Sequence, residues 1–454
     1  MRKYLFAILL AVLCGSTAIN AQVNSEMGFI LDVPYTYSYS TPLVRSVNET
    51  TIVAYYEHDF NGVFVVMQQG SLTADTIELP QSQYVYDFEI IDNTVYYCGK
   101  MPDASNIYDT RERALVGYFD ISPFLNNNNN GVNTAVNYCK FEVENRDHNK
   151  LKKMIAYKTQ GDIYVMAIGE SFLCDQSNQP CHSGLDFFTI IRIRSDVFQE
   201  VKVETFTSEF YHDIVETANH AVLVGGDFNS PTSHSICFRK LRKYNIPYTE
   251  RDYLYRVTFN HTEPSTFVYG TQIEGSDRFI TSTFGYINGV EGTIIRTFNA
   301  SNMEMMAAQF IPSPGEKTQP YELHYVPETG NVLLLQLSTN NPSTRIYTID
   351  PYPTQNYSTI WEYHPNWSFY SLDMYKDDEY IAIGTTSLTP GFYARNVLYD
   401  TPNCMRKNNI DVEMIDIFQV EEFHIPLNFT LPSYSSSSLT TSSSSQRNLI
   451  LDCH

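Results

Sequence analysis

Short apolar and aromatic runs separated by polar turns recur along the chain. In residues 86–99, reading YDFEIIDNTVYYCG, an aromatic-led run, a turn and a second apolar run give the pattern of two paired β-strands. Tyr86 and Gly99 are 13 positions apart, and Tyr370 and Gly384 are 14 apart. Similar stretches end at Gly226, Gly285 and Leu337, and weaker ones cover 51–56 and 154–169. The nearly constant length indicates a repeated structural unit.

Each pair of runs is followed by a third strand-like run and, in most copies, by a less regular fourth. Six repeat steps between Tyr56 and Gly384 span 328 residues, about 55 per step, somewhat more than in compact propeller repeats. A sheet of four short strands cannot bury both faces alone, whereas radial stacking buries them against neighbouring sheets. The pattern therefore predicts an all-β fold, a seven-bladed β-propeller of four-stranded antiparallel blades over residues 22–400. An array of β-sandwiches is the alternative that the spacing also fits.

Both ends of the chain differ from the repeat. Residues 1–21 combine Arg2 and Lys3 with an apolar run and a small-residue end, which is the layout of a signal peptide. We therefore expect a secreted, periplasmic or cell-surface protein, and no other run is long enough to predict a membrane span. Residues 401–454 form a C-terminal extension. Its expected parts are a strand at Val412–Phe423 that completes the seventh sheet, a Ser-rich linker at 433–445 and a Cys-containing end.

The chain is strongly acidic, with 30 Lys and Arg against 51 Asp and Glu and a formal net charge of −21. Nucleic-acid binding requires clustered basic side chains that displace counterions. The one dense basic patch, at 239–243, is typical of a charged strand end that discourages edge pairing. The charge therefore argues against a nucleic-acid partner.

Seven of the eight cysteines follow the predicted signal peptide. We predict two disulfides in an exported protein, Cys174–Cys181 and Cys404–Cys453. Cys98, Cys139 and Cys237 remain, and no C-x-x-C spacing suggests a metal site. Cys98 and Cys237 lie in apolar runs, where we expect buried side chains that act as small hydrophobes.

Motifs for nucleophilic catalysis, zinc-dependent hydrolysis, phosphate binding and dinucleotide binding do not occur in the sequence. We therefore expect no metal, no cofactor and no recognisable catalytic residue. The candidate ligand-binding residues are acids on the expected innermost strands: Asp87, Asp213, Glu322 and Asp373. Their first interpretation is hydrogen bonding to strand or loop backbone. The second is a pair of carboxyl groups for glycoside hydrolysis, which must lie roughly 5–10 Å apart.

The residues VYYCG (95–99), LVGYFDIS (115–122) and MAIGES (166–171), with Cys404 and Cys453-His454, resemble secreted bacterial propeller-like proteins of unassigned function. The resemblance implies export and a propeller-like ring, and it carries over no catalytic residue. Together these observations predict a binding or protein-interaction module for an unknown protein or glycan. A propeller glycoside hydrolase, or a related glycan-active enzyme that uses channel carboxylates, is the alternative.

Overall fold

The computed structural model is built almost entirely of β-strands. It describes residues 26–31, 41–58, 61–68, 73–80, 82–103, 111–125, 133–143, 146–173, 182–206, 209–227, 235–243, 252–258, 268–273, 275–313, 318–338, 344–353, 357–364, 368–376, 379–386, 389–396, 406–414, 420–425 and 430–451. Within these ranges the only helical element is a short 3-10 helix, η1 (Ser122–Phe124), and there is no α-helix. The all-β prediction is confirmed.

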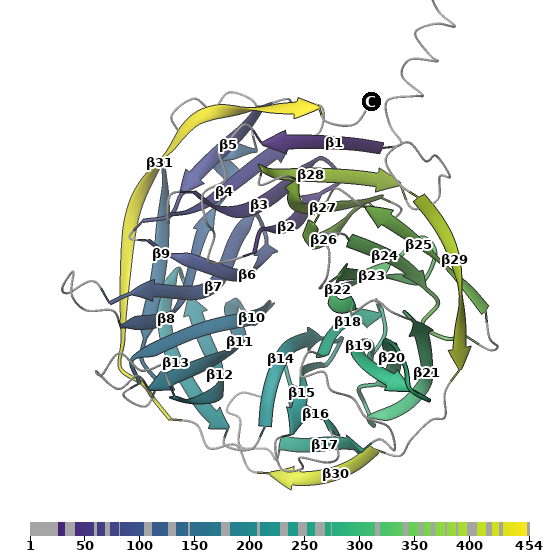
Figure 1. Ribbon diagram of the computed structural model, residues 1–454. Coiled ribbons are helices and arrows are strands. Elements are labelled where there is room, and N and C mark those ends of the chain that lie inside the picture. Colours follow the sequence, from purple (N-terminus) through teal and green to yellow (C-terminus); the bar gives the residue numbers. More distant parts are fainter. Residues whose placement is uncertain are drawn as a thin grey trace, which may run out of the picture.

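The strands form small antiparallel sheets arranged in a ring (Figure 1). Strands that follow one another in the sequence pair antiparallel, and we call each group of successively paired strands a set. The first sets are β2 (Leu43–Asn48), β3 (Thr51–His58), β4 (Asn61–Gln68) and β5 (Thr73–Glu78); β6 (Tyr84–Ile91), β7 (Thr94–Pro102), β8 (Glu112–Asp120) and β9 (Asn133–Phe141); and β10 (His148–Thr159), β11 (Asp162–Leu173), β12 (His182–Arg194) and β13 (Val197–Phe206). In each set the first strand lies nearest the centre of the ring.

The same arrangement continues through the second half of the chain. Its sets are β14 (Glu209–Glu216), β15 (His220–Asp227), β16 (Ser235–Arg242) and β17 (Asp252–Thr258); β18 (Val268–Ile273), β19 (Arg278–Ile287), β20 (Val290–Asn299) and β21 (Glu304–Pro312); β22 (Thr318–Val326), β23 (Asn331–Ser338), β24 (Thr344–Ile349) and β25 (Tyr357–His364); and β26 (Ser368–Lys376), β27 (Glu379–Thr386) and β28 (Thr389–Asn396).

The last of these sets is completed by the N-terminal strand β1 (Glu26–Leu31), which pairs antiparallel with β28. The expectation that Val412–Phe423 completes this sheet is wrong. The described residues of that segment belong to two strands, β29 (Arg406–Met414) and β30 (Val420–Ile425), which pair with other sheets. The first described strand of the chain therefore closes the ring.

The described residues of 406–451 form what we call the belt, because they run around the outside of the ring (Figure 1). The belt pairs in turn with β25 and β21 through β29, and with β17 through β30. Thr430 then bridges Val203 of β13, and β31 (Tyr434–Leu451) pairs with β9, β5 and β1. The Ser-rich stretch expected to be a linker is therefore strand in the structure. A high content of serine and threonine does not prevent the backbone from pairing with a sheet edge, and in this chain the stretch pairs with β9 and β5.

Glycines in the second strand of several sets permit a close approach of the innermost strand. The register of the innermost strand shifts beside them, for example between Val85 and Asp87 in β6. A Cβ atom at Gly99 would lie 1.8 Å from the carbonyl oxygen of Tyr84, and one at Gly225 would lie 1.8 Å from that of Phe210. The glycine that recurs in the sequence pattern is thus required by a β-bulge in the neighbouring strand.

Apolar clusters fill the space between neighbouring sheets. Phe64 of β4 packs edge-on against Phe88 of β6 at 5.3 Å and against Phe119 of β8 at 5.0 Å between ring centroids. At the closure of the ring, Ile381 and Ile383 of β27 pack against the apolar residues of β2, β3 and β4. The first and last sheets are therefore joined by the same kind of packing as the others.

The described cysteines belong to this apolar interior. Cys98, Cys139 and Cys237 are all buried, as predicted for Cys98 and Cys237. Burial raises the pKa of the Cys139 thiol to about 12 and that of Cys98 well above its ordinary value. The cysteines of the two predicted disulfides, Cys174, Cys181, Cys404 and Cys453, lie outside the described residues, so both disulfides stay predictions.

Candidate functional site

A cavity of about 300 Å³ lies at the centre of the ring, and residues of β2, β6, β10, β14, β18, β22 and β26 line it. The structure brings all four acids singled out from the sequence into this one cavity. Its charged and titratable lining consists of Arg45, Asp87, Glu89, Lys153, Asp213, Glu216, Glu322, His324 and Asp373. The cavity is therefore polar, with both signs of charge in contact.

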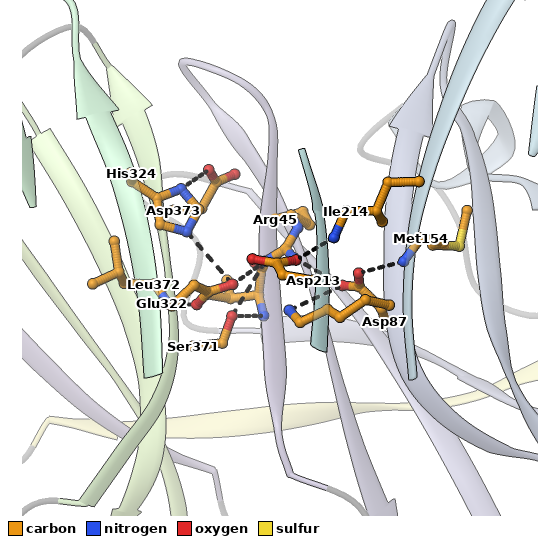
Figure 2. A network of polar contacts seen from close by, with 12 residues as sticks. Arg45, Asp87, Met154, Asp213, Ile214, Glu322, His324, Ser371, Leu372 and Asp373 are labelled. Carbon is orange, nitrogen blue, oxygen red and sulfur yellow. Dashed lines mark hydrogen bonds and ion pairs between the residues drawn. The ribbon is translucent and has the colours of Figure 1, made fainter. Parts of the chain in front are cut away.

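Arg45 of β2 is the centre of the charge network (Figure 2). Its Nη2 atom lies 2.9 Å from Oδ1 of Asp87, and its Nη1 atom lies 3.2 Å from Oε1 of Glu322. Nη1 also donates to the hydroxyl of Ser371 at 3.2 Å. Burial alone would lower the pKa of Arg45, but Glu322 and Asp87 outweigh it and raise the pKa above its ordinary value. One guanidinium thus connects β2 to β6, β22 and β26.

Each of the four predicted acids also accepts a hydrogen bond from the backbone of the next innermost strand. The donors are N–H of Met154 for Asp87 (3.0 Å), Gly270 for Asp213 (2.8 Å), Leu372 for Glu322 (2.8 Å) and Ser46 for Asp373 (2.6 Å). A carboxylate that accepts from backbone N–H is fixed in position and satisfies a donor that would otherwise be buried unpaired. These acids therefore join neighbouring sheets at the axis, as their first interpretation from sequence proposed.

His324 of β22 lies between two of these acids (Figure 2). Its Nε2 atom is 3.5 Å from Oε1 of Glu322, and its Nδ1 atom is 3.3 Å from Oδ1 of Asp373. Burial lowers the pKa of His324, but Glu322 and Asp373 raise it to about 9, so the imidazole is a cation at neutral pH. Burial raises the pKa of Glu322, whereas Arg45 and His324 hold it well below its usual range.

Lys153 of β10 is the third cation of the cavity. Its Nζ atom lies 3.8 Å from Oδ1 of Asp87. Burial would lower the pKa of Lys153, but Asp87, Glu322 and Asp213 raise it. Lys153 follows the β-bulge of β10, the same position that Asp87 and Asp213 occupy in their strands. Only acidic residues on the expected innermost strands were considered as candidates from the sequence, so Lys153 was not predicted.

Asp213 of β14 is held differently from the other predicted acids. Its Oδ1 accepts from N–H of Ile214 at 2.9 Å and its Oδ2 from N–H of Gly270 at 2.8 Å. Burial raises the pKa of Asp213 to about 6, although Lys153 and the Gly270 N–H oppose the shift. Asp213 therefore changes its protonation state near mildly acidic pH.

Glu89 of β6 was not predicted from the sequence, although it stands two positions after Asp87, on the same face of the strand. Within the described part of the chain its carboxyl group has neither a hydrogen bond nor an ion pair. Burial raises the pKa of Glu89 to about 8; Arg45 opposes this shift, and Asp87 and Asp373 add to it. At neutral pH most copies of this group are therefore protonated.

Three tyrosines of β18, β22 and β26 form a row of rings on the innermost strands. Tyr269 stacks on Tyr321 with 6.2 Å between centroids and 20° between planes, and Tyr321 meets Tyr370 edge-on at 6.2 Å. Tyrosine faces of this kind offer both apolar surface and a hydroxyl to a ligand.

Two further features bear on the kind of site. Among the described residues, no group of three or more His, Cys, Asp or Glu side chains is arranged to hold a metal ion. The described part of the chain also contains no helix with the length and hydropathy needed to cross a membrane.

A ring of small antiparallel sheets around an axial cavity defines the chain as a β-propeller. No protein-family model matches the sequence, and the comparison with curated proteins gives no match.

Three solved structures show limited similarity. The WD40 domain of Toxoplasma gondii coronin is 10% identical, with a TM-score of 0.44 over 83% of this chain and 86% of that one. A GH32 β-fructofuranosidase of Bombyx mori in complex with sucrose is 9% identical, with a TM-score of 0.28 over 86% and 94%. Drosophila Semaphorin 1b, extracellular domains 1-2, is 8% identical, with a TM-score of 0.25 over 81% and 88%.

These TM-scores are low, so the fold assignment rests on the strand pairing itself. The part of the sequence resemblance that concerns a propeller-like ring is confirmed by that pairing. Its secreted bacterial part finds no support in the comparisons.

Proposed function

We propose that this chain is an exported, seven-bladed β-propeller that acts as a binding module and takes its ligand in the axial cavity. Blades of four strands are supported by the strand sets above, with β1 as the outermost of the four strands in the last blade. The acidic charge favours a protein or glycan group over nucleic acid as the ligand.

The observation that carries the proposal is that ion pairs and hydrogen bonds hold the cavity carboxylates in place. Asp87 and Glu322 are bound to Arg45, and each also accepts a backbone N–H from a neighbouring strand. Groups fixed in this way need no reordering when a ligand arrives, which favours binding. Catalysis by the same groups would require them to leave these partners.

The test is to fill the cavity without changing its charges. Thr271 of β18 lines the cavity, and Thr271→Trp should occupy part of the space a ligand needs. The mature protein should be screened by glycan array and by thermal shift with small polar compounds. A ligand at about 100 times its Kd stabilises the folded state by about 2.7 kcal/mol, and Thr271→Trp should abolish this effect.

Val197→Trp is the matched control, because Val197 is the first residue of β13 and its side chain is 52% exposed. Ligands that bind wild type and Thr271→Trp equally well would place the binding site on the loops and contradict the proposal.

A glycan hydrolase is the second candidate, and Glu89 is the observation that favours it. Glu89, whose pKa is raised, lines the same cavity as the carboxyl groups of Asp87 and Asp373, and glycoside hydrolysis uses one carboxyl group as acid and a second as base or nucleophile. Release of reducing sugar from a bound glycan, abolished by Glu89→Gln and by Asp87→Asn or Asp373→Asn, would establish the enzyme. Binding without release in wild type would reject it.

A further inference from the structure

We propose that the axial cavity selects ligands that carry a protonated primary amine, and that Glu89 is the group that receives the amine. This inference rests on the cavity being the binding site proposed above. It specifies the chemistry of the ligand.

The first argument is the balance of charge in the cavity. Arg45 is paired with Asp87 and Glu322, Lys153 with Asp87, and His324 with Glu322 and Asp373. Every cation among the described lining residues is thus matched by a carboxylate. The cavity has no cation left over to attract an acidic ligand.

The second argument is the excess of carboxyl groups. Glu216 pairs with Lys243, and both oxygens of Asp213 accept backbone N–H groups. Glu89 alone among the cavity carboxyl groups has no hydrogen bond or ion pair within the described residues. Glu89 is half-buried in the cavity. A partly desolvated acid without a partner is costly, and a cationic ligand would supply that partner.

The surroundings of Glu89 indicate what happens on binding. The other titratable groups lining the cavity are Arg45 on β2, Asp87 on β6, Lys153 on β10, Asp213 and Glu216 on β14, Glu322 and His324 on β22 and Asp373 on β26. Arg45 favours the ionised form of Glu89, while Asp87, Asp373 and Glu216 disfavour it. When an ammonium group enters, the Glu89 carboxyl gives its proton to the buffer and the resulting carboxylate pairs with the ammonium.

The third argument concerns the hydrogen-bond acceptors, besides Glu89, that the cavity offers to an ammonium group. A primary ammonium group has three N–H donors. Thr271 and Gln272 of β18 line the same cavity and provide oxygen atoms that can accept from it; Nε2 of Gln272 donates to the Ser276 carbonyl. The volume, about 300 Å³, is at the small end of ligand pockets, so a single sugar or side chain fits better than a long segment.

The experiment compares amines with their acetylated forms, which keep the shape and lose the charge. Isothermal titration calorimetry of the mature protein near pH 6.5 would use glucosamine and N-acetylglucosamine, and lysine and Nε-acetyl-lysine. We expect at least one amine to bind roughly tenfold more tightly than its acetylated form, about 1.4 kcal/mol. Repeating the titration in buffers of different ionisation enthalpy should show proton release.

Glucosamine binding alone would identify an amino sugar as the source of the amine, and lysine binding alone a peptide side chain. The affinity for a bound amine should also rise between about pH 6 and pH 8 as Glu89 ionises. Glu89→Gln should remove the preference for the amine, the proton release and this pH dependence. Glu328→Gln is the matched control, because Glu328 is exposed in the turn between β22 and β23.

The outcomes separate this inference from the proposed function. Equal binding of amine and acetylated forms, lost together in Thr271→Trp, overturns the inference and leaves the binding module in place. Binding that Thr271→Trp does not change overturns both. Failure of both amines to bind at millimolar concentration overturns the inference. If Glu89→Gln does not fold, the buffer and pH dependence of wild type alone decides the matter.

Discussion

Arg45 and Glu322 are 277 positions apart in the sequence, and their side chains meet at 3.2 Å in the axial cavity. The guanidinium also holds Asp87 at 2.9 Å. Arg45→Met keeps most of the side-chain volume but removes from two buried carboxylates their nearest cation, leaving Asp87 with Lys153 at 3.8 Å and Glu322 with His324 at 3.5 Å. Because breaking a buried pair costs about 3–5 kcal/mol, we expect a loss of this order in the free energy of unfolding, measured by urea denaturation. Arg45→Met combined with Glu322→Gln should recover part of the loss, and an unchanged unfolding midpoint in Arg45→Met would refute the role of the network.

Stability should fall as the pH rises from about 6 to about 9. The pKa of His324 is about 9 in the folded chain and 6.5 ordinarily, so its contribution is complete below about pH 6.5 and is lost as the pH passes 9. The pKa of Glu89 is raised from 4.5 to about 8, so the unfolded chain loses this proton first and stability falls across that interval too.

Calorimetric Tm values measured across this range provide the check. Glu89→Gln should flatten the curve below about pH 6.5 and make it shallower between about pH 6.5 and pH 8, while the decline from about pH 6.5 to pH 9 that belongs to His324 remains. A Tm that rises over the same interval would contradict both assignments.

The bulge next to Gly99 predicts an unusually large effect of a single methyl group. In Gly99→Ala the new Cβ would lie 1.8 Å from the carbonyl oxygen of Tyr84, and this backbone atom cannot rotate away. We expect a loss of at least about 2–3 kcal/mol in unfolding free energy. Gly161→Ala is the comparison, since Gly161 has φ of +84° and no atom within 4 Å of an added Cβ, and should cost only about 1–2 kcal/mol. Equal effects in chemical denaturation would argue against the close approach.

Ending the chain after Leu431 removes β31 and tests the belt. The edges of β9 and β5, which pair with β31 in the structure, would then be exposed. Because unpaired edges promote association between chains, we expect a lower Tm and oligomers in size-exclusion chromatography. Tyr434→Ala keeps the backbone pairing and should remain monomeric if the full chain is. A truncated protein with unchanged Tm and size would show that the belt contributes little.

Export and the disulfides are tested on the protein secreted from its host. We expect an N-terminus at Gln22 and a peptide, under non-reducing conditions, in which Cys174 is joined to Cys181. A second linked pair should join Cys404 to Cys453. Closing a loop of ~15 residues stabilises by about 3 kcal/mol in the entropic account. Alkylation of Cys174 and Cys181 in the native protein would reject the first disulfide.

The strand pairs and the axial acids were predictable because their signals are local. Alternation, the turn and the recurrent glycine all lie within the stretch 86–99, and Asp87 has a fixed place in it. The position of Lys153 is defined by the bulge of β10, and a pattern built on residue type does not detect such a position. Glu89 and His324 follow predicted acids by two positions, so strand alternation could have found them.

The closure of the ring and the belt could not be predicted in the same way. Phe29 of β1 pairs with Leu451 of β31, and no local pattern connects positions so far apart. Polar composition also misled the interpretation of 433–445, because the backbone of this stretch pairs with the edges of β9 and β5, and backbone pairing does not require apolar side chains.

The belt has a consequence for how this protein is made. The belt strands β29, β30 and β31 leave the ribosome after every other described strand, yet they pair with the outer edges of sheets whose strands are made long before. Sheets that form during synthesis therefore have unpaired edges until the belt strands are available. Unpaired edges promote aggregation between chains. If the chain is exported before folding, as its first residues predict, a chaperone that shields these edges until the last strand crosses would determine the yield of native protein.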